Sequence, residues 1–234
     1  MSSRMTRMNP AVLSYYALRR TVGILALSLP FTLVIGAILL ALAGPDHVLP
    51  HPLFQRSISD YYYTPMGSYL VGSLCVIAAF LMCSRGYDLD DEIAGYLAGA
   101  FTLGVAQFPS VNPHIACHTR LQLDVQFAHT GFAALMFFAL AYFCLFLFRR
   151  SSPGKWITRR KGHRNILYGV CGLIIVVCDL VMIGLNFRPV SPWLQPIDPL
   201  LCSESLALAA FGVAWLTKGE GILRDPPHER VRKV

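Results

Sequence analysis

Residues 127–148 read FAHTGFAALMFFALAYFCLFLF, a run that contains one histidine and no acidic, lysine or arginine side chain. A helix that crosses the hydrocarbon core of a bilayer needs about 20 predominantly apolar residues. The run is long enough to span a membrane, whereas a soluble domain would have to bury all of it in its core. The composition of the whole chain decides between these two possibilities.

The composition is that of a membrane protein. Hydrophobic residues make up 55% of the 234 residues, charged residues only 14%, and the mean hydropathy is +0.52. Soluble proteins contain roughly 25% charged residues, so this chain has too few to cover a water-facing surface. The formal net charge of +7 does not indicate nucleic-acid binding, because the basic residues are concentrated between the apolar runs.

Five further runs resemble the first, and together they predict an all-α fold. We expect a single membrane domain over residues 1–234, a polytopic bundle of six transmembrane helices. Gly95 and Gly99 predict close packing of the third helix on a neighbour, and Pro30 predicts a kink in the first. The expected spans are about 21–43, 67–84, 93–109, 127–148, 165–186 and 202–217.

The basic residues predict the orientation of this bundle. Seventeen of the 20 Lys and Arg residues lie on one side of the expected spans, and only Arg56, Arg120 and Arg188 lie on the other. Cytoplasmic loops of membrane proteins carry an excess of Lys and Arg. We therefore expect both termini in the cytoplasm and a multi-pass protein of the plasma (inner) membrane.

The segments expected outside are rich in proline, histidine and aromatic residues and are too long for tight turns. Residues 44–66, 110–126 and 187–201 are therefore predicted to form a cap over the bundle. Aromatic residues are expected to anchor the chain at the two membrane interfaces. These are Tyr61, Tyr62, Tyr63 and Tyr69 outside, with Trp156 and Trp215 inside.

Four ionisable residues on four expected helices form the candidate site. Asp60 precedes the second span, His129 and Glu204 lie near the outer starts of the fourth and sixth, and Asp179 lies inside the fifth. An ionisable group inside a span costs about 2.5–3.5 kcal/mol on insertion scales, so it usually faces the bundle interior with a partner. We expect these four residues to form one polar, ligand-binding pocket, and they are also the catalytic candidates.

Each of the four also has a structural interpretation. Asp60 and Glu204 could cap the second and sixth helices, because a carboxylate accepts from unsatisfied N–H groups at a helix start. His129 could be a hydrogen-bonded packing residue. Asp179 lies too deep for an N-cap but could hold a single hydrogen bond to a neighbouring helix.

Other chemistry leaves few signals. Histidine with carboxylates suits zinc or manganese, but the sequence lacks paired-histidine spacing, so we predict no metal site, and the cofactor stays open. GxSxG, P-loop and GxGxxG motifs are absent, and Ser57 and Ser59 are interpreted as caps. Cys117 and Cys202 are both expected outside, which makes them a candidate disulfide.

Three motifs resemble those of one membrane-protein family. Residues 50–60 read PHPLFQRSISD and resemble the ISD signature of the DRAM/FRAG-type six-helix membrane proteins. HTGFAAL at 129–135 is similar to the His-x-x-Gly-Ala opening of that family's fourth helix. CSES at 202–205, ahead of AFG at 210–212, is similar to the start of its last helix. The likeness is closest to bacterial members without an assigned activity.

The resemblance implies a six-helix fold over nearly the whole chain but no agreed catalytic mechanism. Eukaryotic relatives imply links to autophagy, membrane-stress signalling and lipid-anchor remodelling. A more distant likeness to ceramidase-type hydrolases implies Ser, Asp and His metal ligands, but the paired histidines of those enzymes are missing here.

Three functions remain open. The first is a non-enzymatic protein that binds membrane lipids, or a protein partner of unknown kind, in the outer pocket. The second is a membrane enzyme acting on a lipid head group, with His129 and the carboxylates as acid, base or metal ligands. The third is a proton-coupled transporter, which the nearly apolar inner halves of the helices disfavour. No nucleic-acid partner is expected.

Overall fold

The computed structural model describes residues 10–44, 54–84, 89–113, 115, 117–150, 156–157, 159–187, 198–219, 222 and 232–233. It confirms an all-α fold, with one antiparallel pair of two-residue strands as the only strands in these residues. The elements in chain order are α1 (Pro10–Ala43), the 3₁₀ helix η1 (Ser59–Tyr63), α2 (Gly67–Cys83), α3 (Leu89–Gln107), α4 (Arg120–Tyr142), the π-helix η2 (Phe143–Leu147), β1 (Trp156–Ile157), α5 (Arg159–Phe187), α6 (Pro199–Lys218) and β2 (Arg232–Lys233).

Four helical segments are long and apolar enough to cross a membrane, which indicates a membrane protein. α2 is apolar but has only 17 residues, and α3 opens with an acidic first turn. Each of the six expected spans nevertheless coincides with a helix. The four candidate spans are Ala17–Ala43, Arg120–Leu147, Arg160–Phe187 and Pro199–Lys218.

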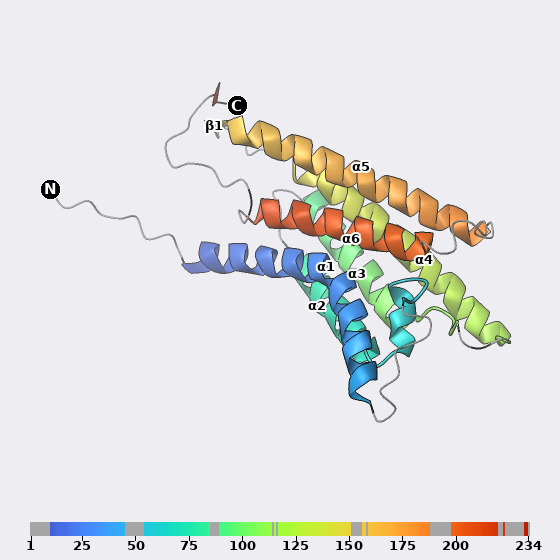
Figure 1. Cartoon of the computed structure of the whole chain (residues 1–234). Coiled ribbons are helices and arrows are strands. Elements are labelled where there is room, and N and C mark those ends of the chain that lie inside the picture. Colours follow the sequence, from blue (N-terminus) through green and yellow to red (C-terminus); the bar gives the residue numbers. More distant parts are fainter. Residues whose placement is uncertain are drawn as a thin grey trace.

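The six helices pack in chain order into a closed ring (Figure 1). Each helix contacts the next one along the chain, and α6 closes the ring by packing against α1. Figure 1 also shows that α1 bends sharply, and Pro30 is the proline inside it. Proline removes a backbone hydrogen bond and clashes with the preceding turn, so the expected kink is present.

Glycines bring neighbouring helices close together. A Cβ atom on Gly99 would lie 2.5 Å from Met82 Cγ and 2.8 Å from the Ala78 carbonyl oxygen, so α3 packs directly on the backbone of α2. A Cβ atom on Gly212 of α6 would lie 2.8 Å from the carbonyl oxygen of Gly23 in α1. Close backbone approach of this kind favours helix association in lipid, as expected for the third helix.

One end of the bundle, which we call the basic end, is defined by Arg20, Arg150, Lys161 and Lys218. Arg20 Nε donates to the carbonyl of Gly219 (3.0 Å), and Lys218 Nζ donates to that of Phe148 (3.2 Å). Arg150 forms a 3.1 Å ion pair with Asp91, and Lys161 Nζ donates to the Arg150 carbonyl (2.9 Å). Basic residues from the N-terminal helix, the α4–α5 connection and the end of α6 therefore lie at one end. We call the opposite end, which carries η1, the η1 end.

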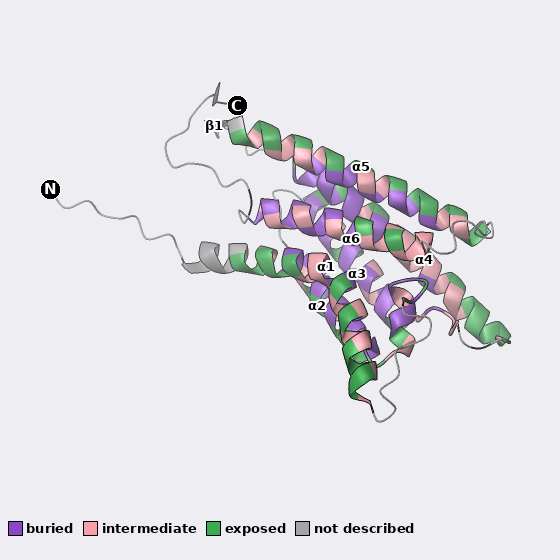
Figure 2. Cartoon of the chain, viewed as in Figure 1, coloured by how far each residue is buried: buried purple, intermediate pink, exposed green. Residues whose placement is uncertain are grey.

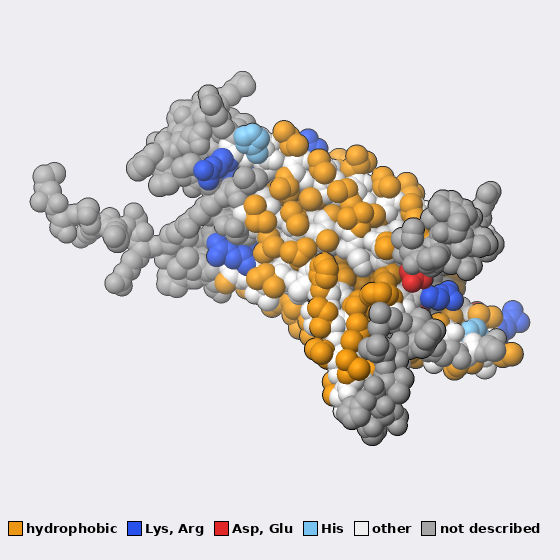
Figure 3. All heavy atoms as spheres, in the orientation of Figure 1, with side chains coloured by type: hydrophobic (Ala, Val, Ile, Leu, Met, Phe, Trp, Pro, Cys, Tyr) orange, Lys and Arg blue, Asp and Glu red, His pale blue; other side chains and the backbone are white. Residues whose placement is uncertain are grey.

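Hydrophobic side chains cover the outside of the bundle between these ends. Exposed positions follow the outward faces of α1 and α5 (Figure 2), and in the view of Figure 3 hydrophobic side chains form a broad band with charged residues at its two ends. Phe31, Leu173 and Phe127 are 64%, 62% and 83% exposed. A water-soluble monomer rarely exposes so large an apolar surface, whereas lipid would cover it.

Two aromatic residues differ from the sequence interpretation. Tyr61 and Trp215 are each only 1% exposed, so they are core residues and do not anchor the chain at an interface. Trp215 packs against Phe143, Phe148 and Phe211 with ring centroids 5.1–5.6 Å apart. Large aromatic rings stabilise such clusters through burial and edge-to-face contacts. The side chain of Trp156 lies outside the described residues.

Candidate functional site

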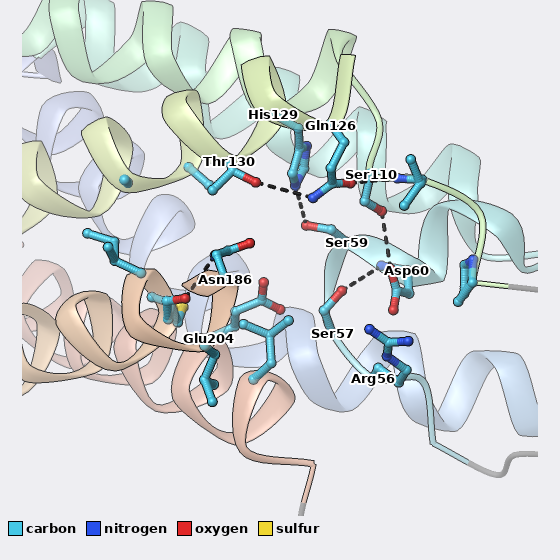
Figure 4. A pocket seen from close by; sticks show the side chains of 18 of the residues that line it. Arg56, Ser57, Ser59, Asp60, Ser110, Gln126, His129, Thr130, Asn186 and Glu204 are labelled. Atoms are coloured by element: carbon cyan, nitrogen blue, oxygen red, sulfur yellow. Dashed lines mark hydrogen bonds between the residues drawn. The ribbon is translucent and has the colours of Figure 1, made fainter. Parts of the chain in front are cut away.

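A cavity of about 770 Å³ lies near the η1 end, and all four sequence-predicted site residues line it. Its walls come from η1 and the residues before it, the α3–α4 connection, α4, α5 and the start of α6 (Figure 4). Besides Asp60, His129, Asp179 and Glu204, its polar lining comprises Arg56, Ser57, Ser59, Ser110, His118, Gln126, Thr130, Asn186 and Asp198.

Short-range hydrogen bonds shape η1 and the turn that follows it. Ser57 Oγ accepts from the backbone N–H of Asp60 (3.0 Å). At the other end of η1, Thr64 Oγ1 donates to the Tyr61 carbonyl (2.7 Å) and accepts from the N–H of Met66 (3.2 Å). Hydroxyl groups that satisfy nearby backbone groups are typical of turns. They fix the backbone that presents Ser59 and Asp60 to the cavity.

Asp60 joins η1 to the α3–α4 connection. Its side chain is 7% exposed, and Ser110 Oγ donates to its Oδ1 at 3.2 Å. Burial raises the pKa of Asp60 above 3.8, while Ser110, Ser57, Arg56 and His129 act in the opposite direction. The N-cap of α2 is Met66, without a side-chain hydrogen bond. The prediction that Asp60 caps the second helix is therefore wrong.

His129 connects α4 to η1 and to the end of α3. α4 begins at Arg120, earlier than the expected span, because Thr119 and Gln122 form a capping box. Because α4 begins at Arg120, His129 lies more than two turns inside the helix. His129 Nδ1 lies 2.6 Å from the Phe108 carbonyl oxygen, and Nε2 lies 3.0 Å from Ser59 Oγ (Figure 4).

Glu204 connects α6 to the start of η1. Its carboxylate accepts from the backbone N–H of Ile58, the N-cap residue of η1. α6 begins at Pro199, after the N-cap residue Asp198, so Glu204 lies beyond its first turn. The prediction that Glu204 caps the sixth helix is therefore wrong, although its carboxylate does accept from a backbone N–H of another element.

Asp179 is the most buried of the four, with 1% exposure. It lies inside α5, and its Oδ2 atom has no hydrogen-bond partner among the described residues. Leaving a buried polar oxygen unsatisfied costs about 1–3 kcal/mol, and more for a charged group. The expected interhelical hydrogen bond does not occupy this oxygen, so Asp179 is a cavity-lining residue with a buried, unsatisfied acceptor.

The four residues therefore share a cavity but not one hydrogen-bond network. Ile58 and Ser59 are hydrogen-bonded to Glu204 and His129, respectively. Asp60 interacts electrostatically with both of these side chains. Asp179 has no such link to η1. The cavity is thus organised around η1, with a separate carboxylate on α5.

The metal site and the disulfide are the two other features that the sequence raised. No group of three or more His, Cys, Asp and Glu side chains in the described residues is placed to hold a metal ion. Cys117 and Cys202 are both exposed, and no disulfide joins them here, so their pairing stays a prediction.

Sequence reasoning missed Ser59 as a functional candidate, because its partner His129 lies 70 residues further along the chain. It also missed Ser110, Gln126 and Asn186. The capping box at Thr119 and Gln122 is a local signal that could have placed Gln126 on a helix with His129.

Comparisons of the chain with models of protein families, with curated proteins and with solved structures find no match. The likeness to the DRAM/FRAG-type proteins accordingly stays a prediction from short motifs, and the function is inferred from the geometry of the cavity.

Proposed function

We propose that the chain is a multi-pass membrane protein whose cavity binds a membrane lipid through a head group that carries a primary amine. The observation behind this proposal is Asp179, a cavity-lining residue of 1% exposure whose carboxyl group has a buried oxygen without a hydrogen-bond partner among the described residues. A carboxylate inside a candidate span costs about 2.5–3.5 kcal/mol. A ligand that donates N–H groups to Oδ2 would recover part of that cost.

The acidic lining and the size of the cavity support an amine-bearing ligand. Among the described residues, four acidic side chains line it, whereas Arg56 is the one Lys or Arg residue. Ligand pockets typically have volumes of roughly 300–1,000 Å³, and 770 Å³ is ample for a lipid head group. The acidic residues are Asp60, Asp179, Asp198 and Glu204.

Thermal unfolding of the delipidated protein in detergent tests this proposal. Phosphatidylethanolamine carries a primary ammonium with three N–H donors, and phosphatidylcholine carries a quaternary ammonium with none. We expect phosphatidylethanolamine to stabilise the protein more, because a ligand that binds only the folded state raises its stability. Asp179→Asn should weaken the binding of phosphatidylethanolamine by roughly ten- to a hundredfold, the equivalent of one charge-assisted hydrogen bond.

Asp124→Asn is the matched control, because Asp124 is an exposed residue of α4 that does not line the cavity. This variant should bind phosphatidylethanolamine as the unmodified chain does. Equal stabilisation by the two lipids, or equal binding by the Asp179→Asn and Asp124→Asn variants, would contradict the proposal.

We also propose that the chain forms one domain of six spans in the plasma membrane, with both termini in the cytoplasm. Two observations support it. The six helices form a closed ring in chain order, and basic residues from three separate segments of the chain meet at the basic end. In that orientation the cavity opens on the non-cytoplasmic side.

A membrane enzyme acting on a lipid head group is the second candidate function. The observation that favours it is the position of His129, which has one ring nitrogen on a carbonyl and the other on a hydroxyl at the cavity. A histidine held in this way is suited to accept and return a proton.

A further inference from the structure

The hydrogen bonds of His129 determine which ring nitrogen carries the proton. The Phe108 carbonyl oxygen, 2.6 Å from Nδ1, can only accept, so Nδ1 carries the hydrogen of the neutral ring. Nε2 then has a free lone pair. Ser59 Oγ lies 3.0 Å from Nε2 and is therefore the donor of that bond. The ring is 6% exposed and held from both sides.

Ser59 differs from the other two serines that line the cavity among the described residues. The Ser57 hydroxyl accepts from the backbone of Asp60, and the Ser110 hydroxyl donates to the carboxylate of Asp60. Only the Ser59 hydroxyl donates to a neutral nitrogen base. Ser59 is the first residue of η1, is half-buried and lines the cavity.

We propose that Ser59 and His129 form a nucleophile–base pair that cleaves an acyl ester of the lipid bound in the cavity. The pair has the geometry expected of such a site: hydroxyl and base within hydrogen-bond distance, and the base oriented by a third group. Here the Phe108 carbonyl is that third group. The choice of substrate rests on the proposed function, whereas the identity of the pair rests on the contacts of His129.

The reaction balances with water as the only co-reactant. Ser59 Oγ attacks the acyl carbonyl carbon as its proton moves to His129 Nε2, and collapse of the tetrahedral intermediate breaks the ester C–O bond. The leaving alkoxide takes the proton from Nε2 and departs as an alcohol, which leaves an acyl-Ser59 ester. Water then attacks this ester and loses a proton to Nε2. The bond from the acyl carbon to Ser59 breaks, a carboxylic acid forms, and Ser59 Oγ regains its proton.

The surroundings of the pair indicate an acyl ester of a membrane lipid. His129 lies two residues inside the apolar run that begins at Phe127, roughly 3 Å along the helix axis. The pair is therefore expected near the boundary between hydrocarbon and head groups, where lipid ester carbonyls lie. Below it the cavity is lined by Ala133 and Phe137 of α4 and Met182 of α5, with Asp179 as the acidic residue. A carboxylate repels an acyl chain and attracts the polar alcohol portion of such a lipid.

A serine-reactive alkyl fluorophosphonate tests the pair directly. The full chain in phosphatidylethanolamine-containing nanodiscs is incubated with the probe, and peptide mass spectrometry locates the adduct. We expect an adduct on Ser59, and loss of that adduct in Ser59→Ala. In His129→Gln the labelling rate should fall at least about a hundredfold, because a general base contributes roughly 10²–10⁴-fold. The same variants should lose release of fatty acid from an acyl-labelled phosphatidylethanolamine.

Ser84→Ala is the matched control. Ser84 is the C-cap residue of α2, donates to the Phe80 carbonyl (2.8 Å) and does not line the cavity. The Ser84→Ala variant should be labelled on Ser59 at the same rate as the unmodified chain. If the bond between Ser59 and His129 only held η1 against α4, its loss would change the stability of the variants, but Ser59 would not react with the probe. Labelling therefore separates the catalytic role from the structural one.

Two results would overturn the inference. One is a folded protein that shows no adduct on Ser59, and the other is a His129→Gln variant that is labelled as fast as the unmodified chain. If Ser59 stays unlabelled while lipid binding depends on Asp179, the catalytic pair is wrong and the proposed function stands. If Ser59 is labelled but phosphatidylethanolamine binding does not depend on Asp179, the pair stands and the proposed ligand is wrong.

Discussion

Replacing His129 with leucine should destabilise the protein by about 1–3 kcal/mol. The substitution removes the 2.6 Å bond to the Phe108 carbonyl and the 3.0 Å bond from Ser59 Oγ. Interhelical hydrogen bonds in membranes average about 0.6 kcal/mol each, which sets the lower limit. The upper limit follows from the Phe108 carbonyl, because an unsatisfied buried acceptor costs about 1–3 kcal/mol. The Ser59 hydroxyl adds little, since water in the cavity can reach it.

Unfolding in mixed micelles with increasing SDS would measure this loss. His163→Leu is the matched control, because His163 is exposed near the start of α5 at the basic end. We expect that variant to lie within about 0.5 kcal/mol of the unmodified chain, as surface substitutions usually do. A His129→Leu protein as stable as the His163→Leu protein would refute the reasoning, because the two hydrogen bonds would then contribute nothing.

Three further predictions concern packing, charge and topology. Gly99→Leu should destabilise the protein by more than Gly72→Leu, because a Cβ at Gly72 meets nothing within 4 Å; equal stability in the same unfolding assay would contradict the close packing of α3. Burial raises the pKa of Asp60, so the folded state holds this proton more tightly and its stabilising contribution is lost as the pH rises above 3.8. The stability of Asp60→Asn relative to the unmodified chain should therefore increase from pH 3.5 to neutral pH in thermal unfolding, and a constant difference would argue against a raised pKa. In intact cells treated with a reductant, a membrane-impermeant maleimide should label Cys117 and spare Cys83, both of which are exposed; labelling of both would refute the topology.

The helices could be predicted because apolar runs of this length have few alternatives to a helical span. The start of α4 could not be predicted in this way, because residues 120–126 are mostly polar and fall outside the apolar run. The capping box that begins the helix is a hydrogen-bonding signal and leaves hydropathy unchanged. Trp215 was misjudged for a related reason. A tryptophan near a span end suits either an interface or a core, and its partners Phe143 and Phe148 come from a distant part of the chain.

The candidate site was predictable in its charged members but not in its contacts. Asp60, His129, Asp179 and Glu204 attract attention because ionisable groups in apolar surroundings are costly. Ser59 carries no such cost and looks like any helix-start serine, so only the folded chain brings it to His129. Likewise, the bond from the Ile58 N–H to Glu204 joins residues 146 positions apart. Local rules favour a cap for Glu204, and a tertiary contact replaces it.

The helices differ in hydrophobic length, and a surrounding bilayer would have to adapt to that difference. Residues 21–43 of α1 carry no charged side chain and form about 35 Å of helix, whereas α2 has 17 residues, about 25 Å. A hydrocarbon core of about 30 Å matches neither. The bend at Pro30 shortens the projection of α1 along the bilayer normal, but α2 has no comparable adjustment. We therefore expect the lipid annulus to be thinnest beside α2, enriched there in short-chain species, and the protein to favour thin membranes over sterol-thickened ones.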